Sequence, residues 1–224
     1  MNLSGIKAVT FDAGGTLIEP WPSVGHVYAA VAAKFGNRDI SAEKLNRAFV
    51  TAWKTKQSFD YSLEAWAALV EEVFQEHLGA RVSGALFHAL YQRFAEADAW
   101  HVYDDVRPPL ELLCTRGYRL GVVSNWDNRL TSLLTRLKLG HYFEMVVLSV
   151  DVGVTKPARK IFNQALALLN LAPPDVLHIG DSLAEDVAAA RACGMSALLL
   201  DRTGGANNSI PSLNALASLL PPTP

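Results

Sequence analysis

Short apolar runs recur along the chain, and a polar residue follows close behind each run. The runs are rich in valine, leucine and isoleucine, lack polar alternation, and cover residues 8–11, 120–123, 145–150, 176–179 and 197–200. Such runs are typical of strands buried on both faces of a parallel sheet. Ligands of these sheets bind beyond the carboxyl ends of the strands. We therefore expect a site where four runs end, at Asp12, Ser124, Asp151 and Asp181.

Helical patterns separate the runs in the second half of the chain, and they cover residues 109–116, 128–139, 157–169 and 184–193. Gly117, Gly140 and Gly194 lie where helices commonly end, and Pro157 occupies a favoured first-turn position. Strands that alternate with helices predict an α/β fold with a doubly wound, Rossmann-like parallel sheet.

Residues 19–105 break this alternation, because they contain no convincing strand pattern. Four amphipathic segments, residues 23–35, 42–57, 63–78 and 84–97, predict helices. Ser41 and Ser62 are suitable N-caps, and Gly36 and Gly79 are suitable stops. The pattern predicts a helical domain, residues 19–105, inserted into an α/β core of residues 1–18 and 106–224. The insertion is interpreted as a lid over the strand ends, and the alternative is a separate bundle without a catalytic part.

Composition narrows the class of protein. The 224 residues are 50% hydrophobic and 19% charged, enough to bury a sizeable core, and the net charge of −2 gives no footprint for nucleic acid or an anionic membrane. Neither a signal-peptide pattern nor an apolar run of about 18 residues occurs. Cys114 and Cys193 lie far apart and are expected as buried thiols in a reducing compartment. We expect a cytoplasmic monomer or homodimer whose partner is a small molecule.

The segment after the first run combines a carboxylate with small residues. Asp12 is followed by Ala13, Gly14, Gly15 and Thr16. A strand-end carboxylate is held rigidly, and small residues let backbone N–H groups approach an anion closely. Asp12 is therefore a candidate nucleophile, with Gly15 and Thr16 as candidates for substrate binding. The alternative is a glycine-rich turn with a capping aspartate.

Two further segments supply groups suited to a phosphate. Ser124 and Asn125 follow the second core run, where a hydroxyl and an amide can donate to a phosphate oxygen, although an N-cap is an equally simple interpretation. Lys156 lies just before the segment that Pro157 opens. Its charge can neutralise a phosphoryl group and a neighbouring carboxylate, and the alternative is an ordinary surface lysine.

A fourth segment carries two carboxylates five residues apart, Asp181 and Asp186, across a predicted strand-to-helix turn. Carboxylates that converge in this way can hold Mg²⁺, which prefers oxygen ligands and keeps several waters. Glu185 lies between them, but the spacing of Asp186 favours it as the ligand. The alternative is that these carboxylates only complement a helix dipole.

In order and spacing, the four segments resemble the motifs of the haloacid dehalogenase-like hydrolases. Around Ser124, Lys156 and Asp181 the sequence is similar to phosphatase-like members, with SNWDNRL, GVTKPARKIF and HIGDSLAEDVAAARACGM. The resemblance covers residues 1–18 and about 106–205. Residues 19–105 resemble the helical cap that members of subfamily I insert between the first two motifs.

The resemblance implies a magnesium-dependent phosphatase that acts on a small phosphorylated molecule. Asp12 would attack phosphorus and form an aspartyl-phosphate. Ser124 would hydrogen-bond the phosphoryl group, and Lys156 would balance charge at the nucleophile. Mg²⁺ would be held by side-chain or backbone oxygens of four residues: Asp12, Gly14, Asp181 and Asp186.

Position 14 departs from the family's pattern. Phosphatases of the family usually carry an aspartate two residues after the nucleophile, which protonates the leaving oxygen, whereas this chain has Gly14. A backbone ligand survives the change, but a general acid worth about 10²–10⁴-fold in rate does not. The resemblance then implies a slow enzyme, one restricted to good leaving groups such as acyl or aryl phosphates, or a substitute proton donor such as Asp127 or His26.

Two other functions stay open at this point. Dehalogenases of the superfamily use a lone aspartate and no metal, so Gly14 suits them, whereas Asp181 and Asp186 argue against them. A binding protein that keeps the fold without catalysis is the other alternative. Trp21 and Trp126 flank the first two motifs and are candidates for substrate contact, while His178 is expected to be a core histidine with satisfied ring nitrogens.

Overall fold

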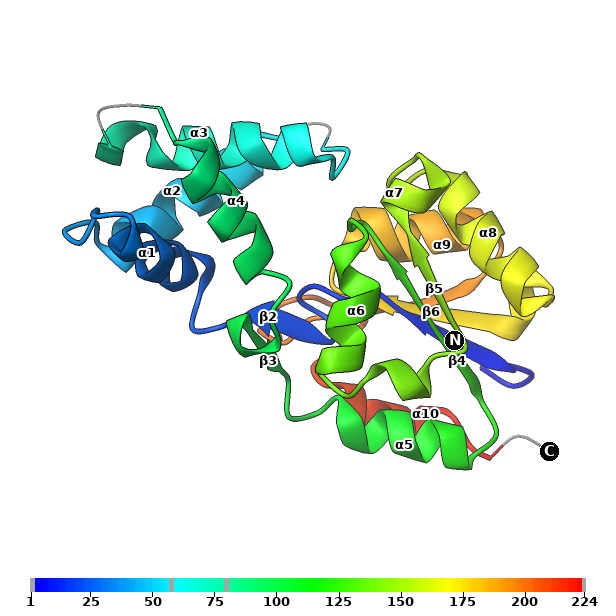
Figure 1. Ribbon diagram of the computed structural model, residues 1–224. Helices are drawn as coiled ribbons and strands as arrows, with labels where there is room; N and C mark the ends of the chain where they lie inside the picture. The colour runs from blue at the N-terminus through cyan, green and yellow to red at the C-terminus, as the bar shows by residue number, and fades with distance from the viewer. Residues whose placement is uncertain (1–2, 57–58, 79–80, 223–224) are drawn as a thin grey trace. The chain divides into compact units, whose positions relative to one another are not determined.

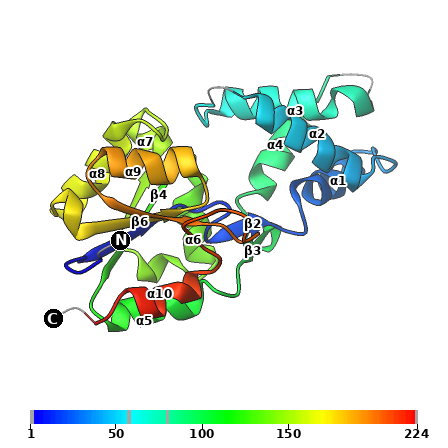
Figure 2. The ribbon, with the colours of Figure 1, turned by 180° about the vertical axis from the view of Figure 1, so that it is seen from behind.

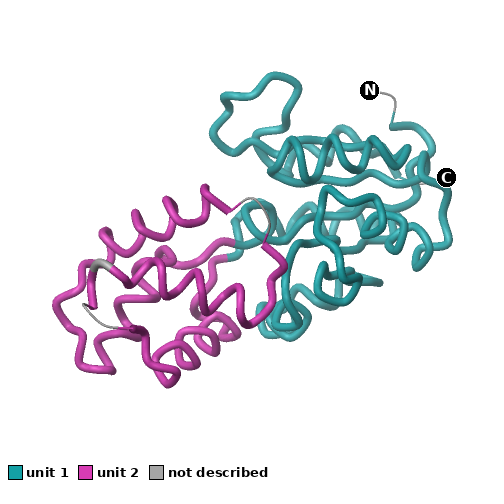
Figure 3. The backbone as a smooth tube through the Cα atoms, turned by 90° about the horizontal axis from the view of Figure 1, so that it is seen from above, with its two compact units in different colours: residues 1–18, 102–224 teal, residues 19–101 magenta. Residues whose placement is uncertain are grey.

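The computed structural model describes residues 3–56, 59–78 and 81–222. The chain forms two compact units, one of residues 1–18 and 102–224 and one of residues 19–101 (Figure 3). The first unit contains the four motif segments. The second contains helices α1 to α4.

Six strands form the main sheet of the first unit, in the order β5-β4-β1-β6-β7-β8 (Figure 1). They are β1 (Ala8–Phe11), β4 (Arg119–Ser124), β5 (Met145–Leu148), β6 (Val176–Gly180), β7 (Ser196–Leu200) and β8 (Ser209–Ile210). Every adjacent pair is parallel. The predicted α/β fold with a doubly wound parallel sheet is confirmed.

Strand β1 lies between β4 and β6, so the chain order reverses at β1. This reversal is the point where open α/β sheets commonly bind ligands. Phe11 pairs with Val122 of β4 and with Ile179 of β6. Because the three strands are parallel and in this register, the residues that follow them lie together at one edge of the sheet.

Helices cover both faces of the sheet. Helices α5 (Arg107–Thr115) and α10 (Leu216–Leu219) pack together on one face, and α8 (Arg159–Leu169) and α9 (Ala189–Ala192) lie on the other (Figures 1 and 2). The remaining helical segments of this unit are α6 (Arg129–Arg136), α7 (Ser149–Val152), η2 (Gly140–Tyr142), η3 (Pro173–Asp175), η4 (Leu183–Ala188) and η5 (Leu213–Ala215).

The core explains why the strands lack polar alternation. All four residues of β1 are buried, as are the last five of β4. Ile161 and Phe162 of α8 pack in one cluster with Val123 and Val147 from neighbouring strands. Complete burial of one such side chain contributes about 1.5–3 kcal/mol. The motif residues are thus attached to a rigid layer.

Two predictions after β5 were wrong. The strand expected over 145–150 ends at Leu148, so Asp151 lies in the short helix α7 and is exposed. The ladder stops because the Val150 N–H and the Ser149 hydroxyl bond the carbonyl of Trp126 instead. Helix α8 begins at Arg159 and not at Pro157, because Ala158 has an extended backbone with ψ of 130°.

The helix expected over 184–193 begins instead as a π-helix. Segment η4 is followed directly by α9 and by Gly194, which has the positive φ of 84° that favours glycine. The Val187 N–H reaches back five residues to the carbonyl of Ser182, at 3.2 Å. Such wide turns are frequent at functional sites.

The second unit has four helices and a core of its own. They are α1 (Val24–Lys34), α2 (Ala42–Thr55), α3 (Leu63–Leu78) and α4 (Gly84–Arg93), followed by η1 (Ala97–Ala99). The hydroxyls of Ser41 and Ser62 accept the expected capping bonds, at 3.4 and 3.1 Å. Helix α4 stops four residues before the predicted end at 97. The predicted helix end at 57 and the stop at Gly79 lie outside the described residues.

Three short strands were not predicted, and the predicted burial of the two cysteines was wrong. Strands β2 (Ile18–Pro20) and β3 (Trp100–Val102) form a separate two-stranded sheet that contains both boundaries between the units, so the expectation of no strand in 19–105 was wrong. Strands of two or three residues, β8 included, are too short to show a period. Cys114 is exposed and Cys193 half-buried, against the expected burial.

Candidate active site

Asp12 is the centre of a hydrogen-bond network at the end of β1. Its backbone N–H donates to the Ile179 carbonyl at 2.9 Å, which continues the β1–β6 ladder by one residue. The Ser124 hydroxyl and the Lys156 ammonium both donate to Oδ1 of Asp12, at 2.8 and 2.7 Å. In the described part of the chain, both hydrogen bonds of this carboxylate run to Oδ1, so Oδ2 is the oxygen suited to attack.

Lys156 connects two carboxylates in the interior of the site. Its ammonium also donates to Oδ1 of Asp186 at 2.5 Å, and its side chain is 2% exposed. Burial acts to lower the pKa of Lys156, but Asp12 and Asp186 outweigh burial and raise the pKa well above its usual value. The lysine therefore stays protonated and offsets charge between two anions.

Asn125 fixes the backbone of Lys156. Its Oδ1 accepts a hydrogen bond from the Lys156 N–H at 2.6 Å, and its Nδ2 donates to the Lys156 carbonyl at 3.1 Å. The same Nδ2 donates to Glu185 at 3.0 Å. The amide predicted to bind substrate is thus occupied in holding the lysine in place.

Asp186 is held by three donors. Besides Lys156, the Ser182 N–H donates to its Oδ2 at 3.0 Å, and Nε2 of His178 lies 3.2 Å from Oδ1. Burial acts to raise the pKa of Asp186, but Lys156 and His178 outweigh burial and lower it well below the usual range. The other ring nitrogen of His178 lies 2.9 Å from the Thr10 hydroxyl, so His178 is the satisfied core histidine that the sequence predicts.

Asp181 completes a cluster of three carboxylates. Ligand oxygens of Asp12, Asp181 and Asp186 all lie within 4.8 Å of one another. Asp181 is open to solvent on one side, yet desolvation by the surrounding protein, together with the charges of Asp12 and Asp186, raises its pKa to about 7. Lys156 supplies one positive charge against three carboxylates, so the donor set fits a small dication with oxygen ligands.

Gly15 lets Asp181 approach this closely. Its φ is +74°, and a Cβ added there would lie 2.3 Å from Oδ2 of Asp181. The Gly15 N–H donates to the Ile18 carbonyl at 2.9 Å and closes the turn, so in this structure it is engaged within the first motif. Thr16 is fully buried, and its hydroxyl has no hydrogen-bond partner within the described residues.

Gly14 lies against an aromatic ring. A Cβ added at Gly14 would lie 3.2 Å from Cζ3 of Trp126 and 3.9 Å from Cη2, so the benzo edge of the indole occupies the space beside this residue. Trp126 is half-buried. The structure thus brings one of the two candidate tryptophans to the first motif.

Each candidate substitute proton donor has a hydrogen-bond partner of its own. Asp127 is buried and pairs with Arg129 through both carboxylate oxygens, at 2.8 and 2.6 Å. His26 belongs to the second unit, where Nδ1 lies 2.9 Å from the Ser23 hydroxyl. Trp21 is in the same unit and packs its ring against His101.

Sequence reasoning missed two residues of the network. Glu185, set aside in favour of Asp186, accepts the bond from Asn125, and desolvation raises its pKa. Its place one residue before Asp186 was the available signal. Ser149 is buried and bonds both backbone groups of Trp126, and nothing in the local sequence marks it.

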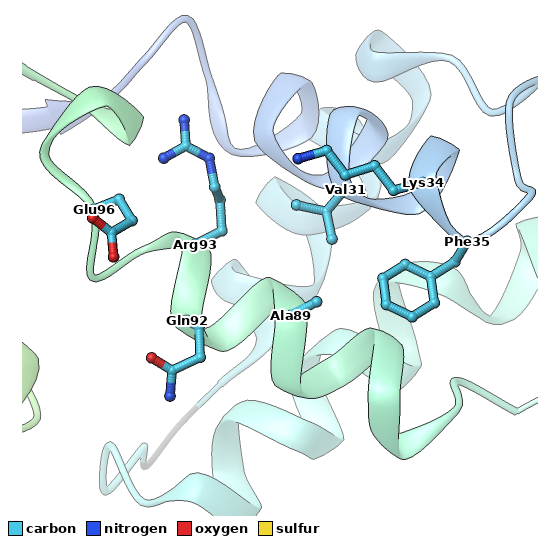
Figure 4. A pocket seen from close by; sticks show the side chains of 7 residues that line it. All are labelled: Val31, Lys34, Phe35, Ala89, Gln92, Arg93 and Glu96. Carbon is cyan, nitrogen blue, oxygen red and sulfur yellow. The ribbon is translucent and has the colours of Figure 1, made fainter.

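A pocket of about 230 Å³ lies in the second unit, between α1 and α4 (Figure 4). Its lining combines apolar side chains with charged ones: Val31, Phe35 and Ala89 with Lys34, Arg93 and Glu96. None of the four motif segments contributes to it. In the described part of the chain, no helix combines the length and apolarity that a membrane crossing requires.

Comparisons with known proteins identify one family of hydrolases. Residues 6–194 match the family described as haloacid dehalogenase-like hydrolase. The haloacid dehalogenase-like hydrolase domain-containing protein 3 of Bos taurus is 34% identical over 207 residues, covering 87% of this chain and 82% of that protein. The phosphoglycolate phosphatase of Chromobacterium violaceum is 29% identical, covering 98% of this chain and 99% of its own.

Solved structures of similar fold include both phosphatases and dehalogenases. A phosphatase of Thermococcus onnurineus is 28% identical with a TM-score of 0.69, covering 96% of this chain and 98% of its own. The hydrolase YfnB of Bacillus subtilis, solved with magnesium, has a TM-score of 0.80 at 18% identity and the same coverage. The L-2-haloacid dehalogenase of Xanthobacter autotrophicus has a TM-score of 0.75 at 20% identity, again with the same coverage. At identities this low, the last two show the fold alone.

Proposed function

The chain belongs to the haloacid dehalogenase-like hydrolases, and we propose that within this family it is a magnesium-dependent phosphatase acting on a small phosphorylated molecule. One observation carries the proposal: Lys156 joins Asp12 to Asp186, while Asp181 lies close to both. A nucleophile, a fixed cation and a cluster of oxygen ligands are the groups that phosphoryl transfer requires.

The reaction begins at Oδ2 of Asp12. This oxygen attacks phosphorus, the bond to the leaving oxygen breaks, and the leaving oxygen keeps the electron pair. Water then attacks the phosphorus of the aspartyl-phosphate and passes a proton to solvent. This step releases inorganic phosphate and regenerates the carboxylate of Asp12. In the structure, the Ser124 hydroxyl and the Lys156 ammonium donate hydrogen bonds to Oδ1 of Asp12. During the reaction, the same two groups would stabilise the charge of the phosphoryl oxygens.

Magnesium fits the ligand set of the site. Carboxylate oxygens of Asp12, Asp181 and Asp186 would hold it with the Gly14 carbonyl, and when bound it would neutralise phosphoryl charge. The raised pKa of Asp181 reflects desolvation and, after it, the negative charge of Asp12 and Asp186, which a dication would relieve. Lys156 keeps Asp12 and Asp186 oriented whether or not magnesium is bound.

The deciding experiment is hydrolysis of 4-nitrophenyl phosphate by the purified protein, with magnesium and with a chelator, beside Asp12→Asn. An activated aryl phosphate tolerates a missing general acid, so we expect turnover that requires magnesium and disappears in the variant. The absence of turnover in every condition would overturn the proposal. A readout of inorganic phosphate distinguishes hydrolysis from transfer to buffer.

Carbon–halogen hydrolysis is the second candidate, and the observation that favours it is the absence of a side chain at Gly14. A leaving halide needs no proton. The three clustered carboxylates favour the phosphatase, because a dehalogenase has no use for a metal site. Release of halide from a 2-haloacid in chelator would reverse this preference. Ligand affinity that persists in Asp12→Asn, without turnover on either substrate class, would instead indicate a binding protein.

We further propose that the helical unit, residues 19–101, is the cap that selects the substrate. Support comes from its own core and from the position of both boundaries in the β2–β3 sheet. Caps of this kind close over ligands and exclude water. Hydrogen exchange of α1 to α4, compared with and without a phosphate analogue, tests the role. Slower exchange with the analogue is expected, and unchanged exchange would contradict it.

A further inference from the structure

The ring of Trp126 is an apolar surface beside Gly14, two residues after the candidate nucleophile Asp12. Its benzo edge lies beside Gly14, where an added Cβ would be 3.2 Å away. Among the described residues, Ser124 and Lys156 donate hydrogen bonds to Asp12, and the two other carboxylates of the cluster lie within 4.8 Å of it. A phosphoryl group satisfies such polar partners. The apolar indole ring is suited to pack against the rest of the substrate, which is the leaving group.

The backbone that carries the ring is held by hydrogen bonds on both sides of the loop. Ser149 accepts a hydrogen bond from the Trp126 N–H at 3.0 Å and donates to the Trp126 carbonyl at 3.1 Å. The residues on either side are also fixed, since Asn125 bonds the backbone of Lys156 and Asp127 bonds the backbone and side chain of Arg129. Preorganisation of this kind lets a small aromatic contact contribute its full energy to binding.

We propose that Trp126 forms the leaving-group subsite and that the enzyme selects aryl phosphates, whose flat leaving group packs on the indole and departs without a proton. This inference rests on the proposed phosphatase function. Glycine at position 14 serves the subsite, because any larger residue there would press on the ring. Glycine at position 14 also supplies no proton donor. The leaving oxygen must therefore be stable as a phenolate when it takes the electron pair of the P–O bond.

The first test measures kcat/KM for para-substituted phenyl phosphates of graded leaving-group pKa and for acetyl phosphate, a good leaving group without a ring. We expect kcat/KM to fall at least tenfold from the most acidic to the least acidic phenol. Trp126→Leu is expected to lower the ratio of aryl to acetyl phosphate kcat/KM by about tenfold, and Trp126→Phe to retain most of it. Leu168→Ala removes an exposed apolar side chain of α8 and is the control that leaves the ratio unchanged.

The second test compares Gly14→Asp in the wild-type and Trp126→Leu backgrounds, with glycerol phosphate as a substrate that needs a proton donor. We expect a several-fold larger gain without the ring, because the two positions compete for one space. An equal gain in both backgrounds, or an equal loss of aryl and acetyl phosphate hydrolysis in Trp126→Leu, would overturn the inference while leaving the phosphatase intact. No turnover of any phosphate compound would instead remove the proposed function and the inference together.

Discussion

The Lys156 ammonium donates a hydrogen bond of 2.7 Å to Oδ1 of Asp12, and both side chains are buried. The nucleophile is therefore charge-balanced before substrate arrives. Burial holds the pKa of Asp12 above its usual value; the lysine opposes this rise, and the neighbouring Asp186 adds to it. This pairing links stability and chemistry, because the same cation that permits a buried carboxylate also prepares it for attack on an anion.

Replacement of Lys156 by methionine keeps an unbranched side chain, one heavy atom shorter, and removes the ammonium charge. We expect at least a 100-fold loss of aryl phosphatase kcat, and a loss of about 3–5 kcal/mol in the free energy of unfolding, because removal of one partner leaves buried charge uncompensated. Steady-state kinetics and chemical denaturation check the two effects. Lys160→Met is the matched control, since Lys160 is exposed and its ammonium bonds only the Val152 carbonyl. Equal behaviour of the two variants would contradict this account.

Removal of the Asp181 carboxylate separates repulsion from metal binding. In chelator, Asp181→Asn is expected to raise the Tm, because it relieves the crowding with Asp12 and Asp186. Magnesium is expected to stabilise the wild type by mass action and the variant much less. Thermal melts at several magnesium concentrations provide the measurement. A magnesium shift of equal size in both proteins would place the ion elsewhere.

Gly15→Ala tests the close approach of Asp181 to the first motif. The variant combines an unfavourable φ of +74° with a Cβ 2.3 Å from the Asp181 carboxylate, so we expect about 2–4 kcal/mol of destabilisation and weaker magnesium binding. Gly204→Ala has the same φ of +74° but nothing within 4 Å of the added Cβ. We expect this variant to lose about 1–2 kcal/mol of stability, from backbone strain alone, and to bind magnesium with unchanged affinity. Similar losses in both variants would show that the contact with Asp181 has no cost.

The sequence was sufficient to predict five of the six strands of the main sheet and the edge where the functional side chains gather. Phe11, Val122 and Ile179 lie in short apolar runs that predict buried strands, and parallel pairing then brings Asp12, Ser124 and Asp181 to one edge. Hydrophobic period and the direction of parallel strands carry this information. The first can be read from a few neighbouring residues, and the second holds for every parallel sheet.

The contacts inside the site could not be predicted in this way. The occupation of the Gly15 N–H by Ile18, the hold of Asn125 on Lys156 and the approach of Trp126 to Gly14 each depend on how a loop closes. Loop closure joins residues that the sequence does not mark as partners. For the same reason Ser149 was missed, and β5 was extended two residues too far.

Asp105 shows how the C-terminal segment is tied to the first motif, and it predicts an acid limit to stability. Its carboxylate accepts two bonds of 2.8 Å from Arg202 and one each from the Ser212 hydroxyl and the Leu213 N–H. Arg202 in turn donates to the Thr16 carbonyl at 2.9 Å. Burial acts to raise the pKa of Asp105, but these donors outweigh burial and hold it below its usual value.

The sign of the pH dependence follows from this lowered pKa. Below a pH of about 4 the unfolded state binds the proton more readily than the folded state, so the stabilisation is complete above that pH and is lost as the pH falls further. At pH 7 we expect Asp105→Asn to cost about 2–4 kcal/mol, and we expect the cost to shrink in denaturation series taken toward pH 3. Asp175→Asn is the control, because the surface pair of Asp175 with Lys7 contributes about 0–1 kcal/mol. If the difference between wild type and Asp105→Asn stayed constant down to pH 3, the network would not depend on the charge of Asp105, and hydrogen bonding alone would hold the C-terminal segment to the first motif.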